Sequence, residues 1–210
     1  MRSLLIIVCI LLSIPAWSDQ SFSARKQAGS ADEPIIGGPC EGCELVFIGL
    51  PENPGASVRI GPPDEPGEPM VIEGTVRRLD GKAASGIIVY AYHTDFQGIY
   101  PVAATRHGRL RGWAKTDENG YYRFETIRPG PYPSRDLPQH VHMHVIEPGV
   151  GTYFIDDILF SDDPLLTARR LTELQEGRGG NGLANPEKEL GVGWKVRRDI
   201  TLGLNISGYQ

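Results

Sequence analysis

The sequence has no apolar run long enough to cross a membrane. Its longest hydrophobic segment, Leu4 to Trp17, has 14 residues, whereas a spanning helix needs about 20. Because this run follows Arg2 and ends between the small residues Ala16 and Ser18, we expect residues 1–18 to be a cleavable secretory signal peptide. The sequence therefore predicts a secreted or periplasmic protein without a stable membrane anchor.

Positive charge is also in short supply. The chain carries 21 Lys and Arg against 26 Asp and Glu, a formal net charge of −5, and it has no basic cluster. This balance argues against a nucleic-acid partner, because such partners require a basic surface. Small anionic substrates stay possible, since the local field in a cleft matters more than net charge.

Cysteine is scarce as well, with three in the whole chain. Cys9 falls in the expected signal peptide, which leaves Cys40 and Cys43 in the sequence Pro-Cys-Glu-Gly-Cys. In an oxidising compartment we expect this pair to form a disulfide. A redox-active dithiol and half of a zinc site are the alternatives, but no second cysteine pair completes a zinc site.

Helical periodicity is nearly absent: only residues 163–175 are predicted to form a helix, with Asp163 at its start. From residue 70 onward, short apolar or alternating runs are separated by Gly and Pro turns, which is typical of an all-β sandwich. The predicted strands are 71–79, 86–92, 121–127, 140–147, 153–160 and 194–206.

The sequence divides after the signal peptide into two parts. We expect residues 19–69 to be an extended N-terminal arm that contains the cysteine pair and ends in the Pro/Gly-rich linker 61–69. Within the arm, residues 44–50 are predicted to form a short strand. Residues 70–210 are expected to form one β-sandwich domain.

Three of the five histidines alternate at His140, His142 and His144, in a predicted strand. Side chains two apart on a strand point to the same face, so neighbours in this trio could share one metal ion. Tyr132 lies just upstream in Pro-Gly-Pro-Tyr-Pro. Imidazole nitrogen together with phenolate oxygen suits a ferric ion.

The turn motifs of residues 74–132 resemble an extracellular sandwich module related to transthyretin and carboxypeptidase regulatory domains. The resemblance rests on Gly-Thr-Val at 74–76, Asp-Gly at 80–81 and Thr-Asp at 116–117. It implies a transthyretin-like or immunoglobulin-like β-sandwich. Taken alone, it supports a non-catalytic module that binds carbohydrate or protein, and this is our second hypothesis.

Two further motifs, Gly-Ile-Tyr at 98–100 and Pro-Gln-His-Val-His at 138–142, follow the same order as in another family. With Pro-Gly-Pro-Tyr-Pro at 129–133, they resemble the intradiol ring-cleavage dioxygenases, the catechol and protocatechuate 3,4-dioxygenase group, over about residues 70–165. The resemblance implies one Fe(III) per chain, with four ligands: Tyr100, Tyr132, His140 and His142.

The same resemblance implies an activity. A catechol-type aromatic diol would be cleaved by O2 between its two hydroxylated carbons, giving a cis,cis-muconate-type dicarboxylic acid. Tyr132 would be catalytic, as an axial ligand that leaves the iron and accepts a substrate proton. His140 would be the other axial ligand, with Tyr100 and His142 equatorial. A homo-oligomer is also possible.

The sequence departs from the family at one position. Better-known members have an arginine three residues before the first histidine ligand, and here that residue is Leu137. Arg135, two residues earlier, is the candidate to stabilise negative charge on the substrate in its place. The alternatives are that this stabilisation comes from elsewhere, or that substrate preference and rate differ from those enzymes.

The third hypothesis is a zinc or copper site that uses the three alternating histidines without tyrosine.

The remaining polar residues are expected to have structural or surface positions. His93 and His107 belong to no motif and are expected at the surface. Asp156 and Asp157 are expected to flank a strand end, in a structural role.

Overall fold

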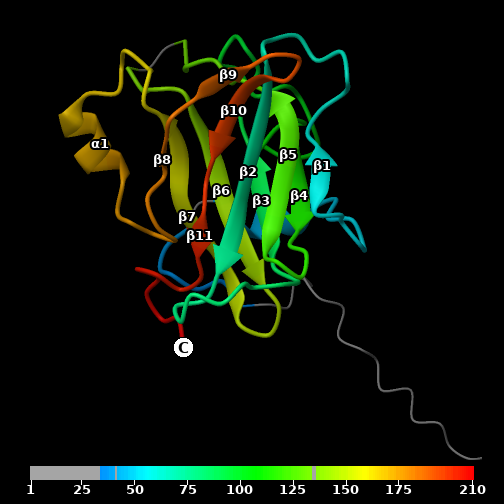
Figure 1. Ribbon diagram of the computed structural model, residues 1–210, viewed down its shortest axis with the longest axis vertical. Coiled ribbons are helices and arrows are strands. Elements are labelled where there is room, and N and C mark those ends of the chain that lie inside the picture. Colours follow the sequence, from blue (N-terminus) through cyan, green and yellow to red (C-terminus); the bar gives the residue numbers. More distant parts are fainter. Residues whose placement is uncertain (1–33, 41, 134–135) are drawn as a thin grey trace, which may run out of the picture.

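The protein is a sandwich of two β-sheets with one short helix at its side (Figure 1). The computed structural model describes residues 34–40, 42–133 and 136–210. The fold class predicted from the sequence is confirmed. The expected signal peptide, the first part of the arm and Arg135 lie outside the described residues.

The first sheet is built around β2, whose apolar residues alternate with polar ones. Ile72 on β2 lies opposite Phe124 on the antiparallel neighbour β5, and both side chains are buried between the sheets. In sheet order the strands are β1 (Ser57–Arg59), β5 (Tyr121–Ile127), β2 (Pro69–Arg77), β10 (Gly193–Arg197) and β9 (Glu187–Glu189), while β11 (Ile200–Thr201) also pairs with β2.

The second sheet carries the predicted histidine strand near its centre. In order its strands are β4 (Arg111–Lys115), β3 (Ile88–Tyr92), β6 (His140–Glu147), β7 (Gly151–Phe160) and β8 (Leu183–Ala184). Every residue of β3 is buried. One face of β3 packs into the core between the sheets, and the other packs in a smaller cluster with Val46 and Trp113. This two-sided burial explains why residues 86–92 are continuously apolar.

The arm covers the outer face of the second sheet. The predicted strand at 44–50 is wrong: these residues begin with the 3₁₀ helix η1 (Cys43–Phe47). The Trp113 indole Nε1 donates a hydrogen bond to the Val46 carbonyl oxygen at 2.7 Å, which fixes η1 on β4. Further along, Ile60 is buried in the main core next to β1. The arm is therefore part of the sandwich packing from residue 34 to residue 69.

Two predicted elements near the C-terminus are shorter than expected. The helix α1 is confined to Ala168–Leu174, because Thr167 caps it by accepting a hydrogen bond from the Arg170 backbone N–H. Upstream, the Asp163 carboxylate accepts from the backbone N–H groups of Leu165 and Gln139 and holds a turn instead.

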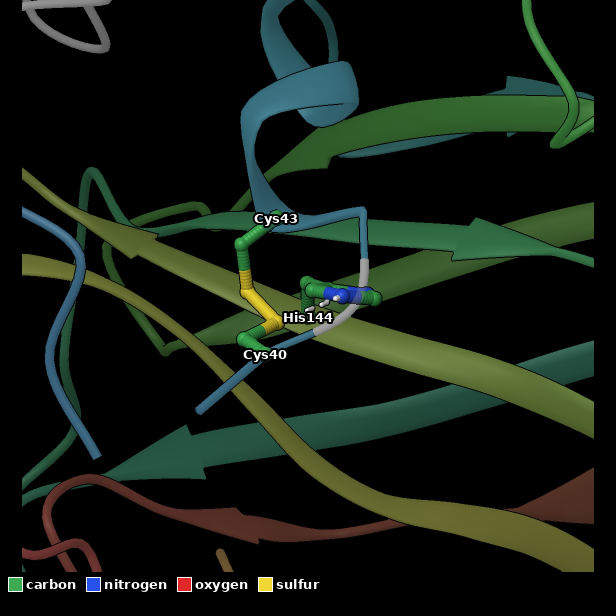
Figure 2. A group of neighbouring side chains, drawn as sticks. All are labelled: Cys40, Cys43 and His144. Carbon is green, nitrogen blue, oxygen red and sulfur yellow. Dashed lines mark hydrogen bonds between the residues drawn. A yellow bond between two sulfur atoms is a disulfide. The ribbon is translucent and has the colours of Figure 1, made fainter. Parts of the chain in front are cut away.

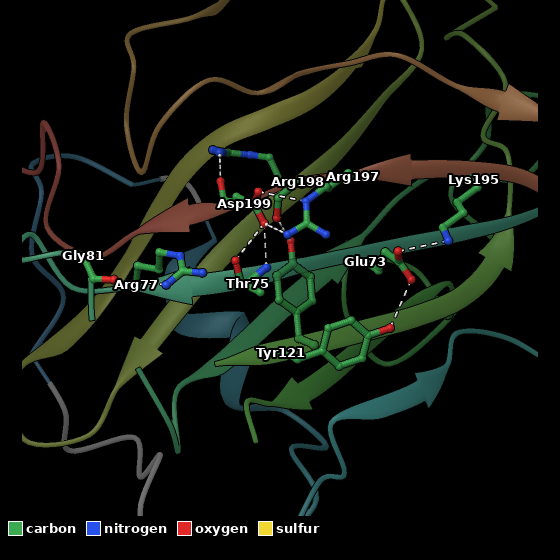
Figure 3. A network of polar contacts seen from close by, with 10 residues as sticks. Glu73, Thr75, Arg77, Gly81, Tyr121, Lys195, Arg197, Arg198 and Asp199 are labelled. Carbon is green, nitrogen blue, oxygen red and sulfur yellow. Dashed lines mark hydrogen bonds and ion pairs between the residues drawn. The ribbon is translucent and has the colours of Figure 1, made fainter. Parts of the chain in front are cut away.

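The predicted strand 194–206 is interrupted between β10 and β11. The buried guanidinium of Arg198 donates to several backbone carbonyl oxygens, including that of Gly179 at 3.2 Å, and so turns the chain inward. Asp199 accepts from the Thr75 backbone N–H at 2.8 Å and from Arg197, which ties the break to β2 (Figure 3). The same guanidinium donates to the Asp156 carbonyl oxygen at 3.4 Å, so the network joins this break to β7 of the second sheet.

No helix in the described part of the chain is long and apolar enough to span a membrane.

Candidate metal centre

The four predicted ligands meet at one place, around the hydroxyl of Tyr132. Tyr132 Oη lies 2.6 Å from Tyr100 Oη, 3.2 Å from His140 Nε2 and 3.4 Å from His142 Nε2. The two tyrosines come from separate loops, and the two histidines lie two residues apart at the start of β6 (His140–Glu147). Three donor atoms within hydrogen-bond distance of a fourth, Tyr132 Oη, form a coordination set that fits a single cation.

A close backbone contact holds the two tyrosine loops together. Gly98, at φ +79°, passes so near the second loop that a Cβ would lie 1.8 Å from the Pro131 carbonyl oxygen. The Gly130 N–H donates to the Asp95 carbonyl oxygen at 2.8 Å, and the Thr94 hydroxyl donates to the Gly130 carbonyl oxygen at 2.9 Å. Glycine at 98 is required by both the φ angle and the close approach, and it fixes the Tyr100 loop against the Tyr132 loop.

A β-bulge sets the environment of His142. On β7, Asp156 and Asp157 together lie opposite this one residue of β6, because the register shifts between Val141 and Met143. Bulges of this kind re-aim side chains and are common beside active sites. Here the bulge allows His142 Nδ1 to donate to Asp157 Oδ2 at 3.0 Å.

Both histidines therefore have one ring nitrogen already occupied. His140 Nδ1 donates to the Pro138 carbonyl oxygen at 2.8 Å, and His142 Nδ1 donates to Asp157. In each ring this leaves Nε2 as the atom with a free lone pair, directed at the tyrosine hydroxyls. Such partners are what orient histidine ligands in metal sites. The side chains thus fit a cation with an N2O2 donor set.

The electrostatics also favour a cation at this point. Burial, followed by the hydrogen bond from Tyr132, raises the pKa of the Tyr100 phenol far above its ordinary value. Burial opposes the charged form of Asp157, but the attraction and hydrogen bond from His142 outweigh it and keep the pKa of Asp157 below its usual range. Because a bound metal ion reverses this penalty on phenolates, two half-buried phenols beside two imidazoles fit a metal centre.

A cavity of about 460 Å3 opens onto these side chains. Its walls include Tyr92, whose ring stacks on His142 with centroids 4.5 Å apart, and Phe154. Arg106 is the one lysine or arginine among its described lining residues, against four carboxylates: Asp156, Asp157, Glu173 and Glu176. The cavity is large enough for a small aromatic molecule, and its walls are mainly acidic.

Comparison with known proteins identifies the family. The family model described as "Dioxygenase" matches residues 47–176, more than half of the chain, including all four candidate ligands. The chain belongs to the intradiol ring-cleavage dioxygenase family. This family is iron-dependent.

Two curated relatives illustrate how far the likeness extends. The chain is 34% identical over 128 residues to catechol 1,2-dioxygenase 1 of Acinetobacter lwoffii, covering 58% of this chain and 41% of that protein. It is 30% identical over 112 residues to the protocatechuate 3,4-dioxygenase beta chain of Burkholderia cepacia, covering 48% of each. The chain therefore spans less than half the length of these relatives.

Solved structures show the same fold. The dioxygenase domain of a dioxygenase carbohydrate-binding protein fusion from the cellulolytic bacterium Streptomyces sp. SirexAA-E superposes with a TM-score of 0.56 at 24% identity, covering 72% of this chain and 88% of that one. Catechol 1,2-dioxygenase from Acinetobacter sp. ADP1 gives a TM-score of 0.58 at 20% identity, covering 74% and 59%.

The structure does not test the residue expected to replace the family arginine. Arg135 lies outside the described residues, and Leu137 is not among the described residues that line the cavity. The role predicted for Arg135 remains a prediction. Arg106, which does line the cavity, was not singled out from the sequence.

The third alternating histidine does not join the other two. His144 Nε2 faces Cys40 Sγ at 3.8 Å, whereas the group of potential ligands near Tyr132 consists of His140, His142 and Asp157. The three-histidine hypothesis therefore does not fit the geometry. The predicted Cys40–Cys43 disulfide is present.

The surface positions predicted for two other histidines are wrong. His93 and His107 were expected at the surface, but their exposed fractions are 0% and 2%. His93 bonds to the Thr94 carbonyl oxygen and the Thr126 hydroxyl, and the His107 ring stacks on Tyr92 at 3.9 Å. His107 thus forms the layer behind the ring that packs on His142.

Asp157 was also missed as a functional residue. It was expected at a strand end, but it lies inside β7 and orients a candidate ligand. Two adjacent carboxylates within the apolar run 153–160 were the available signal, since buried aspartate needs a partner.

Proposed function

We propose that the protein is a non-haem Fe(III) intradiol dioxygenase, with one iron per chain, that cleaves a catechol-type ring with O2. The observation that carries the proposal is the contact of Tyr132 Oη with Tyr100, His140 and His142 within 2.6–3.4 Å. Family membership supports the same reaction, in which the product is a cis,cis-muconate-type dicarboxylic acid.

When bound, ferric iron would supply a Lewis acid that holds both catechol oxygens and makes the ring reactive toward dioxygen. The chain's own contribution follows from its geometry. Tyr100, Tyr132, His140 and His142 would hold the ion, and two phenolates match its hard, highly charged character. Asp157 and the Pro138 carbonyl would keep the two imidazoles aimed at it.

Tyr132 is the candidate to accept a substrate proton. Its hydroxyl is the centre of the donor set, in contact with Tyr100 and with both histidines. If the arriving diol displaced it from the ion, the Tyr132 phenolate would be a base beside the diol hydroxyls. The residue thus combines the roles of ligand and general base.

The walls of the cavity narrow the substrate class. Among the described residues, four carboxylates and one arginine line it, so an additional carboxylate on the ring would enter an unfavourable field. We propose a catechol without an anionic ring substituent. The expected preference, measured as kcat/KM, is at least about tenfold for catechol over protocatechuate, equivalent to about 1.4 kcal/mol.

The decisive experiment is a visible spectrum of the ferric protein before and after anaerobic addition of catechol. We expect a tyrosinate-to-iron band that shifts when the diol binds. Tyr132→Phe should retain iron but lose at least about 100-fold in kcat, as expected for removal of a general base. Tyr121→Phe is the matched control, because the Tyr121 hydroxyl donates to Glu73 within the first sheet, away from the candidate ligands on the second sheet. A colourless, iron-free protein after ferric reconstitution would rule the proposal out.

We also propose that the protein is exported, on the basis of the apolar run Leu4 to Trp17 and the small residues around position 18. N-terminal sequencing of protein recovered from the extracellular or periplasmic fraction checks this. Intact Met1 on all of the recovered protein would contradict it.

A further inference from the structure

A second group of potential ligands includes two residues of the same cavity wall, Cys40 and His144. The sulfur atoms of Cys40 and Cys43 and a nitrogen of His144 all lie within 4.8 Å of one another. Figure 2 shows the disulfide with the His144 ring directly beside the sulfur of Cys40, at 3.8 Å. None of these three residues takes part in the proposed ring cleavage.

The surroundings of this group are short of hydrogen-bond partners. Among the described residues, four buried polar side-chain atoms have no partner, and two of them are His144 Nδ1 and His107 Nε2. His107 Nε2 lies over the loop between the cysteines, 2.5 Å from where a Cβ on Gly42 would be. His144 Nδ1 thus has no hydrogen bond that ties the ring to another group, and its Nε2 faces the sulfur of Cys40, so the Nε2 lone pair is available to a cation at the two sulfurs.

The accessibility of the two sulfurs differs. Cys43 is fully buried, whereas Cys40 lines the cavity that also contacts His142. A small dithiol in the cavity could therefore attack the Cys40 sulfur. The 3₁₀ helix η1, which begins at Cys43, is also held on β4 by the Trp113–Val46 hydrogen bond, which does not depend on the disulfide.

We propose that Cys40, Cys43 and His144 form a binding site for a thiophilic cation such as Zn2+ once the disulfide is reduced. A dithiol reductant supplies two electrons and two protons and becomes a disulfide itself, giving the Cys40 and Cys43 thiols. Binding of the ion then releases those two protons, so that two thiolates and one neutral imidazole hold it.

The observed spacing fits this assignment. Cys-x2-Cys is the usual cysteine pair of zinc sites. Zn–S and Zn–N bonds of about 2.3 and 2.05 Å at a tetrahedral angle place sulfur and nitrogen about 3.6 Å apart, close to the 3.8 Å between Cys40 Sγ and His144 Nε2. Because Cys40 and His144 line the cavity, water or a small ligand from the cavity would complete the coordination.

The test uses the full-length protein carrying Cys9→Ser, so that Cys40 and Cys43 are the only thiols. The protein is reduced with a phosphine and titrated with Co2+, then with Zn2+ as competitor. We expect a sulfur-to-Co2+ charge-transfer band at one equivalent in the reduced protein and none in the oxidised protein. Cys43→Ser should weaken Zn2+ binding at least 100-fold, and His144→Ala at least tenfold.

Tyr132→Phe is the control for binding at the iron centre, and it should leave the sulfur band unchanged. Circular dichroism of each variant confirms that it is folded. The proposal is overturned if the reduced protein shows no sulfur band, if the band survives Cys43→Ser, or if the disulfide cannot be reduced without unfolding. The tyrosinate–iron band is a separate readout, so the fate of the proposed dioxygenase function does not decide this test.

Discussion

Replacing Asp157 is expected to weaken iron binding although Asp157 is not itself one of the four ligands. Its carboxylate holds His142 by the 3.0 Å hydrogen bond to Nδ1, across the bulge in β7. Loss of such a partner typically costs about 10–100-fold in metal affinity, or about 1.4–2.7 kcal/mol. We place Asp157→Asn at the lower end, because an amide oxygen can still accept the hydrogen bond while the charge is lost. Asp157→Ala loses both and belongs at the upper end.

The assay is competition for Fe(III) with a chelator of known affinity, followed through the tyrosinate–iron band. Asp156→Asn is the matched control, since it changes the neighbouring carboxylate of the same bulge and the same cavity wall. Asp156 accepts from the Gly177 N–H at 2.7 Å and does not contact the candidate ligands. If Asp157→Ala binds iron within twofold of the wild type, or no more weakly than Asp156→Asn, the assigned role of Asp157 is incorrect.

Three further changes test the packing around the centre. Gly98→Ala should lower the free energy of unfolding by about 3 kcal/mol in urea titrations. The control is Gly86→Ala, with an expected loss of about 1 kcal/mol, because Gly86 has the same φ of +79° but open space around it. Equal losses would show that the contact with Pro131 is unimportant. Burial lowers the pKa of His93 in the folded protein to about 4, whereas in the unfolded chain it is near 6.5. As pH falls, the unfolded chain therefore takes up the proton first, and about 3 kcal/mol of stability should be lost between pH 6.5 and 4. His93→Gln should make the stability profile flatter in that range, and an unchanged profile would contradict the assignment. Reduction of the Cys40–Cys43 disulfide should lower the free energy of unfolding by only about 2 kcal/mol, because the closed loop has four residues; a loss above about 4 kcal/mol in calorimetry would mean that the bridge anchors more than this loop.

The sequence was a good guide to whatever depends on local pattern. The run 86–92 predicted a central strand because both of its faces are buried, and the alternation in 121–127 predicted one of its partners across the sandwich. The four candidate ligands could be named because their motifs keep a fixed order along the chain, and Tyr100 and Tyr132 indeed meet although 32 residues separate them.

What the sequence did not reveal depends on contacts between distant segments. Residues 44–50 are apolar enough for a strand, but they begin with the helix η1. The Trp113 indole donates a hydrogen bond to the Val46 carbonyl oxygen and holds this helix on β4. Asp157 acts on His142 only because a register shift places two residues of β7 opposite one of β6. The burial of His93 had a local signal, since it extends the apolar run 86–92. The burial of His107 did not, because its neighbours in sequence are Arg106 and Gly108.

The arm that packs on the second sheet has a practical consequence for dissecting this protein. A chain trimmed to the family match, residues 47–176, would keep Tyr100, Tyr132, His140 and His142, yet it would lack Pro39 and Cys40 from the cavity wall. It would also lose β10 and β11, the parallel neighbours of β2. Such a fragment would carry every candidate ligand on an incomplete sandwich. If it failed to bind iron, the cause would be the missing packing around the ligands and not the ligands themselves.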